Sequence, residues 1–106
     1  MKGSLVLDAG VLTLHFLDDA RVRRYFDDVA DQRKTGHMAS VNLSEFYYKA
    51  CEKLGKGVAD IRYYQARRSG INVVETDEEL DRTAGVEKCR HATVLSLADC
   101  YALAFL

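Results

Sequence analysis

The sequence contains no proline and no closely spaced pair of cysteines. Its three cysteines, Cys51, Cys89 and Cys100, are odd in number and lack the C-x-x-C spacing of zinc sites and redox motifs. We therefore expect free thiols in a reducing compartment rather than disulfides or bound zinc. Because proline is absent, breaks between elements have to be inferred from glycines and helix caps.

A strong net charge and a long hydrophobic run are also missing. The formal net charge is −1, so no overall basic field attracts nucleic acid, and any such site requires a local patch. The apolar run Leu5-Val6-Leu7 is too short for a signal peptide or a membrane span. We expect a cytoplasmic protein without a membrane segment. The length of 106 residues predicts one domain, 1–106.

Short apolar runs alternate with amphipathic stretches along the whole chain. This pattern predicts an α/β fold with a short central parallel sheet, in which sites form at the carboxyl ends of the strands. Gly36 is expected to end the second helix in a left-handed conformation. We expect strands over residues 4–7, 37–41 and 71–74, and helices over 11–17, 20–33, 42–54, 58–68, 78–90 and from 96 onward.

Three carboxylates occupy corresponding positions in this alternation. Asp8 follows the first strand, Glu45 lies in the first turn of the helix after the second strand, and Asp99 lies in the first turn of the last helix. A parallel sheet places strand ends and helix starts at one edge, so these side chains are candidates for a shared pocket. Three carboxylates in one pocket repel one another unless a hard cation such as Mg²⁺ or Mn²⁺ neutralises them. Such an ion activates water for phosphodiester hydrolysis.

A second interpretation assigns the same residues to helix termini. Asn42-x-x-Glu45 and Ser96-x-x-Asp99 have the spacing of capping boxes, and acids in a first turn interact favourably with the helix dipole. Asp8 fits a turn that precedes a helix. However, Asp99 lies within an almost wholly apolar stretch, 95–106, and burying a bare carboxylate costs several kcal/mol. From spacing alone both interpretations stay open.

Three stretches of the chain resemble the PIN-domain family: Leu5-Val6-Leu7-Asp8-Ala9, Val41-Asn42-Leu43-Ser44-Glu45-Phe46 and Leu95-Ser96-Leu97-Ala98-Asp99-Cys100-Tyr101-Ala102-Leu103-Ala104. The S-L-A-D core of the third stretch is the most specific. The resemblance implies a small three-layer α/β/α, Rossmann-like nuclease fold. It also implies that Asp8, Glu45 and Asp99 hold one or two Mg²⁺ or Mn²⁺ ions and a nucleophilic water. Many members are VapC-type ribonuclease toxins, so the resemblance implies an RNA substrate, an antitoxin partner and a homodimer.

The sequence departs from the family pattern in two places. Gly10 stands where the family usually has Ser or Thr, two residues after the first Asp. The family also continues beyond the last motif with a fourth strand, a further acid and a closing helix, so the sequence looks shortened at its C-terminus. We expect the first strand to become a sheet edge, which favours self-association.

Lys49, Lys53 and Lys56 lie near one face of the helix that carries Glu45. They are the candidates for RNA-backbone contact, and the alternative is a solvated helix face with local acidic partners. The first functional hypothesis is a metal-dependent endoribonuclease, the toxin of a toxin–antitoxin pair. The second is a non-catalytic PIN-like binding or scaffold module that acts through a protein partner.

Overall fold

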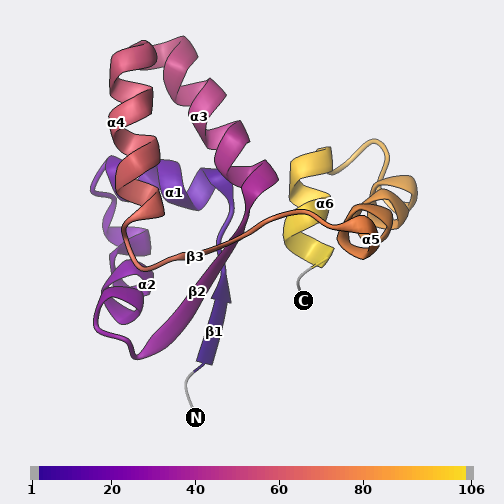
Figure 1. Cartoon of the computed structure of the whole chain (residues 1–106), viewed down its shortest axis with the longest axis horizontal. Coiled ribbons are helices and arrows are strands. Elements are labelled where there is room, and N and C mark those ends of the chain that lie inside the picture. Colours follow the sequence, from indigo (N-terminus) through magenta and orange to yellow (C-terminus); the bar gives the residue numbers. More distant parts are fainter. Residues whose placement is uncertain (1–2, 105–106) are drawn as a thin grey trace.

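Alternating strands and helices build the protein in the order that the sequence predicts. The computed structural model describes residues 3–104. Figure 1 shows their arrangement. The elements are β1 (Gly3–Val6), α1 (Ala9–Phe16), α2 (Ala20–Ala30), β2 (Lys34–Ala39), α3 (Ser40–Leu54), α4 (Lys56–Arg67), β3 (Asn72–Val74), α5 (Glu78–Arg90) and α6 (Leu97–Ala104).

The three strands form a parallel sheet in the order β1-β2-β3. In the register, Leu5 of β1 lies opposite Gly36 of β2, and Met38 of β2 lies opposite Val73 of β3. Helices α1 to α4 lie on one side of the strands and α5 and α6 on the other (Figure 1). The predicted α/β architecture is confirmed, and within residues 3–104 β1 is an edge strand, as expected.

The helix starts follow from local sequence chemistry. The Asp19 carboxylate accepts a hydrogen bond from the backbone N–H of Arg21 at 2.8 Å, and this cap starts α2. The Asp77 carboxylate accepts one from Leu80 at 2.7 Å and starts α5 in the same way. Such caps satisfy backbone donors that have no partner inside the helix.

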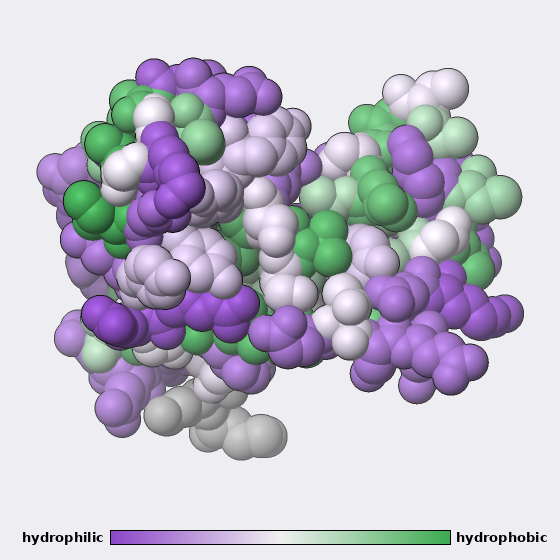
Figure 2. Space-filling view, turned by 45° about the horizontal axis from the view of Figure 1, so that its top comes forward, coloured by the Kyte–Doolittle hydropathy of each residue, from purple (hydrophilic) through white to green (hydrophobic). Residues whose placement is uncertain are grey.

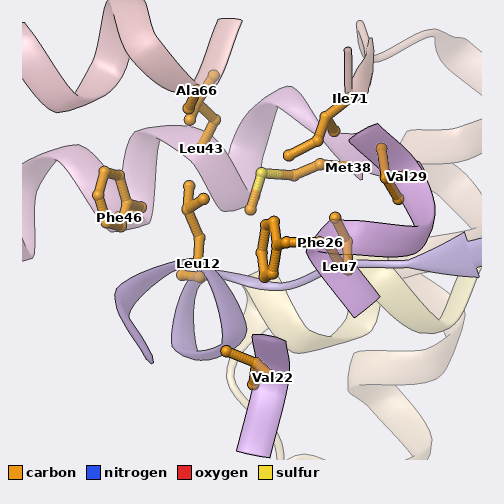
Figure 3. Packing of buried hydrophobic residues seen from close by; sticks show 11 residues of the cluster. Leu7, Leu12, Val22, Phe26, Val29, Met38, Leu43, Phe46, Ala66 and Ile71 are labelled. Atoms are coloured by element: carbon orange, nitrogen blue, oxygen red, sulfur yellow. The ribbon is translucent and has the colours of Figure 1, made fainter. Parts of the chain in front are cut away.

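The core lies between the sheet and helices α1 to α4. Leu12, Met38, Leu43 and Phe46 are each at most 1% exposed. Figure 3 shows Leu12, Met38 and Leu43 pointing toward one another from three different elements. Full burial of such a side chain contributes about 1.5–3 kcal/mol. This packing fixes α1 and α3 against the strands, and it thereby places Asp8, which precedes α1, and Glu45, which lies in α3.

The prediction that Gly36 ends the second helix is wrong. Helix α2 ends at Ala30, and the left-handed residue after it is Gln32, with φ 60°. Gly36 lies inside β2 instead, where a Cβ atom would come within 2.9 Å of Val29 Cγ2. Glycine is therefore needed here because α2 packs closely on the strand.

None of the helices within residues 3–104 is long and apolar enough to cross a membrane.

Two glycine-to-alanine variants should change stability in opposite directions. Gly36→Ala forces a methyl group against the stiff side chain of Val29, so the free energy of unfolding should fall by about 1–3 kcal/mol. Gly85→Ala adds a methyl group in α5 where no atom lies within 4 Å of it, and it should raise stability by about 0.5–1 kcal/mol. Urea unfolding measures both. Equal effects of the two variants would contradict the close packing of α2 on β2.

Candidate active site

Asp8 lies at the carboxyl end of β1. The backbone N–H of Leu7 donates to the His37 carbonyl at 2.8 Å, which extends the pairing with β2 by one residue. The chain then turns into α1, and Asp8 Oδ1 accepts a hydrogen bond from the backbone N–H of Val11 at 2.8 Å. Asp8 is therefore the N-cap of α1. Its Oδ2 accepts no hydrogen bond from any residue in the described range 3–104.

Glu45 follows the carboxyl end of β2. Helix α3 begins at Ser40, two residues earlier than predicted, so Glu45 lies in its second turn rather than its first. The Glu45 side chain is 18% exposed, and its Oε1 lies 3.7 Å from Lys49 Nζ. At this distance the pairing is loose, and such partly solvated pairs contribute little to stability.

Asn42 is not the cap of α3, contrary to the prediction. It is the third residue of the helix and is completely buried. Its Nδ2 donates a hydrogen bond of 2.8 Å to the carbonyl oxygen of Ala98 in α6. Its Oδ1 is buried and has no partner among the described residues. A buried amide oxygen without a donor costs free energy of folding. Asn42 is therefore a polar side chain inside the interface between α3 and α6.

Asp99 forms the capping box that the sequence predicts. The backbone N–H of Ser96 donates to Asp99 Oδ2 at 3.2 Å, and the backbone N–H of Asp99 donates to Ser96 Oγ at 3.1 Å. The preceding loop is held by Lys88, whose ammonium group donates to the carbonyl oxygens of Ala92 and Leu95 at 2.9 and 2.7 Å. The start of α6 is thus fixed from α5 by Lys88 and from α3 by Asn42.

These contacts bring the three acid-bearing segments to one edge of the sheet. The carboxyl end of β1 pairs with that of β2, α3 continues directly from β2, and Asn42 joins α3 to the residue before Asp99. The carboxylates do not form a ready-made cluster, however. Within residues 3–104 no group of three or more His, Cys, Asp or Glu side chains could hold a metal ion. Asp8, Glu45 and Asp99 are anchored separately around this edge.

The donor chemistry fits a hydrated divalent cation. In both Asp8 and Asp99 one carboxylate oxygen serves the helix cap, and the other accepts no hydrogen bond from the described part of the chain. Mg²⁺ commonly binds through one or two carboxylates and keeps several waters, so three converging acids are not required. A Cβ at Gly10 would meet only Asp8 Oδ1, at 3.5 Å, so the space beside this carboxylate is open.

The three candidate lysines do not line one common surface. Lys49 and Lys53 line a groove beside α1. Lys56 does not line it, and its ammonium group lies 2.8 Å from Asp60 Oδ2. The Tyr47 hydroxyl donates to the other oxygen of Asp60 at 2.7 Å. Both contacts hold the pKa of the Asp60 carboxyl below its ordinary value.

The family model for the PIN domain matches residues 5–105. The chain belongs to the PIN-domain family. Among solved structures, this PIN domain is similar to VapC20 of Mycobacterium tuberculosis, which is described as a toxin that cleaves the sarcin–ricin loop. The TM-score is 0.74 at 18% sequence identity, over 97% of this chain and 80% of VapC20. A search of curated proteins gave no match.

Sequence reasoning missed the role of Asn42, which joins α3 to α6. Asn42 occurs beside Leu43 and four residues before Phe46, on the buried face of α3. A polar residue on a buried face requires a hydrogen-bond partner, so the spacing of Asn42 relative to Leu43 and Phe46 already indicated a buried contact. Arg62 of α4 lines the same groove as Lys49 and Lys53. Its position depends on how α3 and α4 pack together, and nothing local in the sequence indicates that.

Two substitutions of Asn42 test the direction of its amide. Asn42→Asp replaces the donor with a buried carboxylate facing the Ala98 carbonyl, so the free energy of unfolding should fall by about 3–5 kcal/mol. Asn42→Leu loses one hydrogen bond but also removes the unpartnered oxygen, and it should cost only about 1 kcal/mol. Urea unfolding at pH 7 measures both. If Asn42→Asp were the milder variant, a hydrogen bond donated by Asn42 to the Ala98 carbonyl would not be what holds α3 against α6.

Proposed function

We propose that this PIN domain is a metal-dependent endoribonuclease whose site consists of Asp8, Glu45 and Asp99. The observation that carries the proposal is the buried Asn42–Ala98 hydrogen bond, which holds the start of α6 against the start of α3. This bond ties the segment of Asp99 to the segment of Glu45 at the sheet edge where Asp8 lies. Membership of the PIN-domain family supports the same assignment.

The three carboxylates have different roles in the proposed site. Asp8 and Asp99 present their second carboxylate oxygens, and Glu45 adds a mostly buried carboxylate. Together they would hold Mg²⁺ or Mn²⁺. A divalent cation there supplies Lewis-acid stabilisation of charge on a phosphoryl oxygen and makes a water more acidic. The remaining carboxylate oxygens act as hydrogen-bond acceptors that orient the attacking water toward the phosphorus.

We further propose that the protein is the toxin of a toxin–antitoxin pair and forms a homodimer. VapC20, which shares the fold, is itself described as a toxin. Val94, Leu97 and Leu103, near or within α6, are 79%, 50% and 37% exposed. Figure 2 shows apolar surface beside charged residues over the part of the molecule built from α5 and α6. Exposed apolar surface of this kind favours contact with another protein chain.

The alternative of a non-catalytic scaffold module also has a specific observation in its favour. The described residues contain no group of three acids that could hold a metal ion, and Gly10 provides no hydroxyl beside Asp8. Loss of RNA cleavage in a charge-removing variant that still folds distinguishes the two functions.

The decisive comparison uses Asp8→Asn with Asp77→Asn as its matched control. Both residues cap a helix through one carboxylate oxygen, and asparagine caps a helix about as well as aspartate, so both variants should fold. Only Asp8→Asn removes a charge from the proposed site. With Mg²⁺ or Mn²⁺ and a single-stranded RNA, Asp8→Asn should lower the cleavage rate by at least about a hundredfold. Asp77→Asn should cleave like the unmodified protein.

Equal cleavage by both variants would show that Asp8 is only a cap, and the nuclease proposal would fail. Failure of the unmodified protein to cleave RNA in the presence of Mg²⁺ or Mn²⁺ would favour the scaffold module.

A further inference from the structure

A groove runs beside the proposed site, between α1, α3 and α4. It has a volume of about 360 Å³. Leu17 and Leu54 form its exposed apolar lining, and these two residues are 64% and 49% exposed. Lys49, Lys53 and Arg62 contribute the positive charge along the same groove. The groove thus combines an apolar surface with three cations.

The cations differ in how far they are already neutralised. Lys49 lies 3.7 Å from the Glu45 carboxylate. In the described part of the chain, Lys53 and Arg62 form no ion pair with a carboxylate, whereas Lys56 outside the groove is paired with Asp60. The guanidinium carbon of Arg62 lies 5.4 Å from the centre of the Phe16 ring, a contact that orients the side chain and leaves its N–H donors available. The groove therefore has positive charge on Lys53 and Arg62 that no carboxylate in the described part of the chain neutralises.

The groove also adjoins the carboxylates. Gly10 is two residues after Asp8, and Lys49 is one helical turn after Glu45. Because Gly10 has no side chain and a Cβ there would meet only Asp8 Oδ1, the end of the groove nearest Asp8 stays open. A strand whose scissile phosphate lies at the carboxylates can continue directly into it.

We propose that this groove is a subsite for the nucleotide next to the scissile phosphate. Its base packs on the apolar lining, and its phosphate binds Lys53 and Arg62. This inference rests on the proposed function. A volume of about 360 Å³ is at the lower end of the range for small-ligand sites, which suits a single nucleotide better than a peptide helix. The pairing of an apolar surface with cations matches a ligand that carries both a ring and a phosphate.

The test measures binding of a single-stranded RNA hexamer in EDTA, by fluorescence anisotropy at several salt concentrations. Without a divalent cation the readout does not depend on cleavage. The Lys53→Gln and Arg62→Gln variants should each reduce the slope of log K against log salt by about 0.7, the value for one phosphate contact on a single strand. Lys56→Gln removes the same charge from the same region but outside the groove, and its slope should not change.

A second variant separates the base contact from the phosphate contact. Gly10→Leu fills the open end of the groove, where a side chain meets no backbone, and the residue lies in a helix in which leucine is a better former than glycine. It should weaken RNA binding while leaving the salt slope unchanged.

Three results would overturn the proposal. If the Lys53→Gln and Arg62→Gln variants bind RNA like the unmodified protein, these two side chains do not contact phosphate. If Lys56→Gln reduces the salt slope equally, the attraction of RNA to the protein is non-specific. Displacement of the hexamer by an equally charged Glu-Leu repeat peptide, with the same dependence on Lys53 and Arg62, would assign the groove to a protein partner. The proposed function has its own test: it is contradicted if Asp8→Asn cleaves RNA at the normal rate, and this outcome does not depend on how the hexamer binds.

Discussion

A buried amide hydrogen bond, from Asn42 of α3 to the Ala98 carbonyl of α6, connects the two sides of the sheet at its carboxyl edge. The α5–α6 pair lies on the opposite side of the strands from α1 to α4 (Figure 1). Because the amide is fully buried, the bond is not exchanged for one to water, and its geometry is well defined. The position of Asp99 relative to Glu45 therefore depends on this contact, and the candidate site depends on that position.

Helix capping by Asp8 and Asp99 does not exclude the ion binding that we propose for the same acids. A carboxylate has two oxygens, and in Asp8 and Asp99 one oxygen serves the backbone of a helix start. The cap holds the carboxylate in a fixed direction, and this makes the other oxygen a better-placed ligand than that of a freely rotating side chain. The caps are observed, and the proposed metal site uses the carboxylate oxygens that the caps leave without a hydrogen bond.

Features set by nearby residues were predictable from the sequence, and features set by tertiary contact were not. The caps at Asp19 and Asp77 and the Ser96–Asp99 box were accessible because both partners lie within three residues of each other. Asn42 has the right spacing for a cap, but its partner is 56 residues away, and burial decides its role. Gly36 resembles a helix stop until the close approach of Val29 is known. Whether the acids bind a cation depends on side-chain placement at that edge, which no local pattern reveals.

The most direct test of the account is a titration of Mn²⁺ into ¹⁵N-labelled protein, followed by paramagnetic broadening of backbone amide signals. If the carboxylates share a cation, residues 8–10, 42–45 and 98–99 should broaden together at the same Mn²⁺ concentration, although they are far apart in the sequence. The first turn of α5, with Glu78, Glu79 and Asp81, provides an internal reference for non-specific binding to acidic surface. Broadening there first, or at only one of the three segments, would contradict a shared metal site.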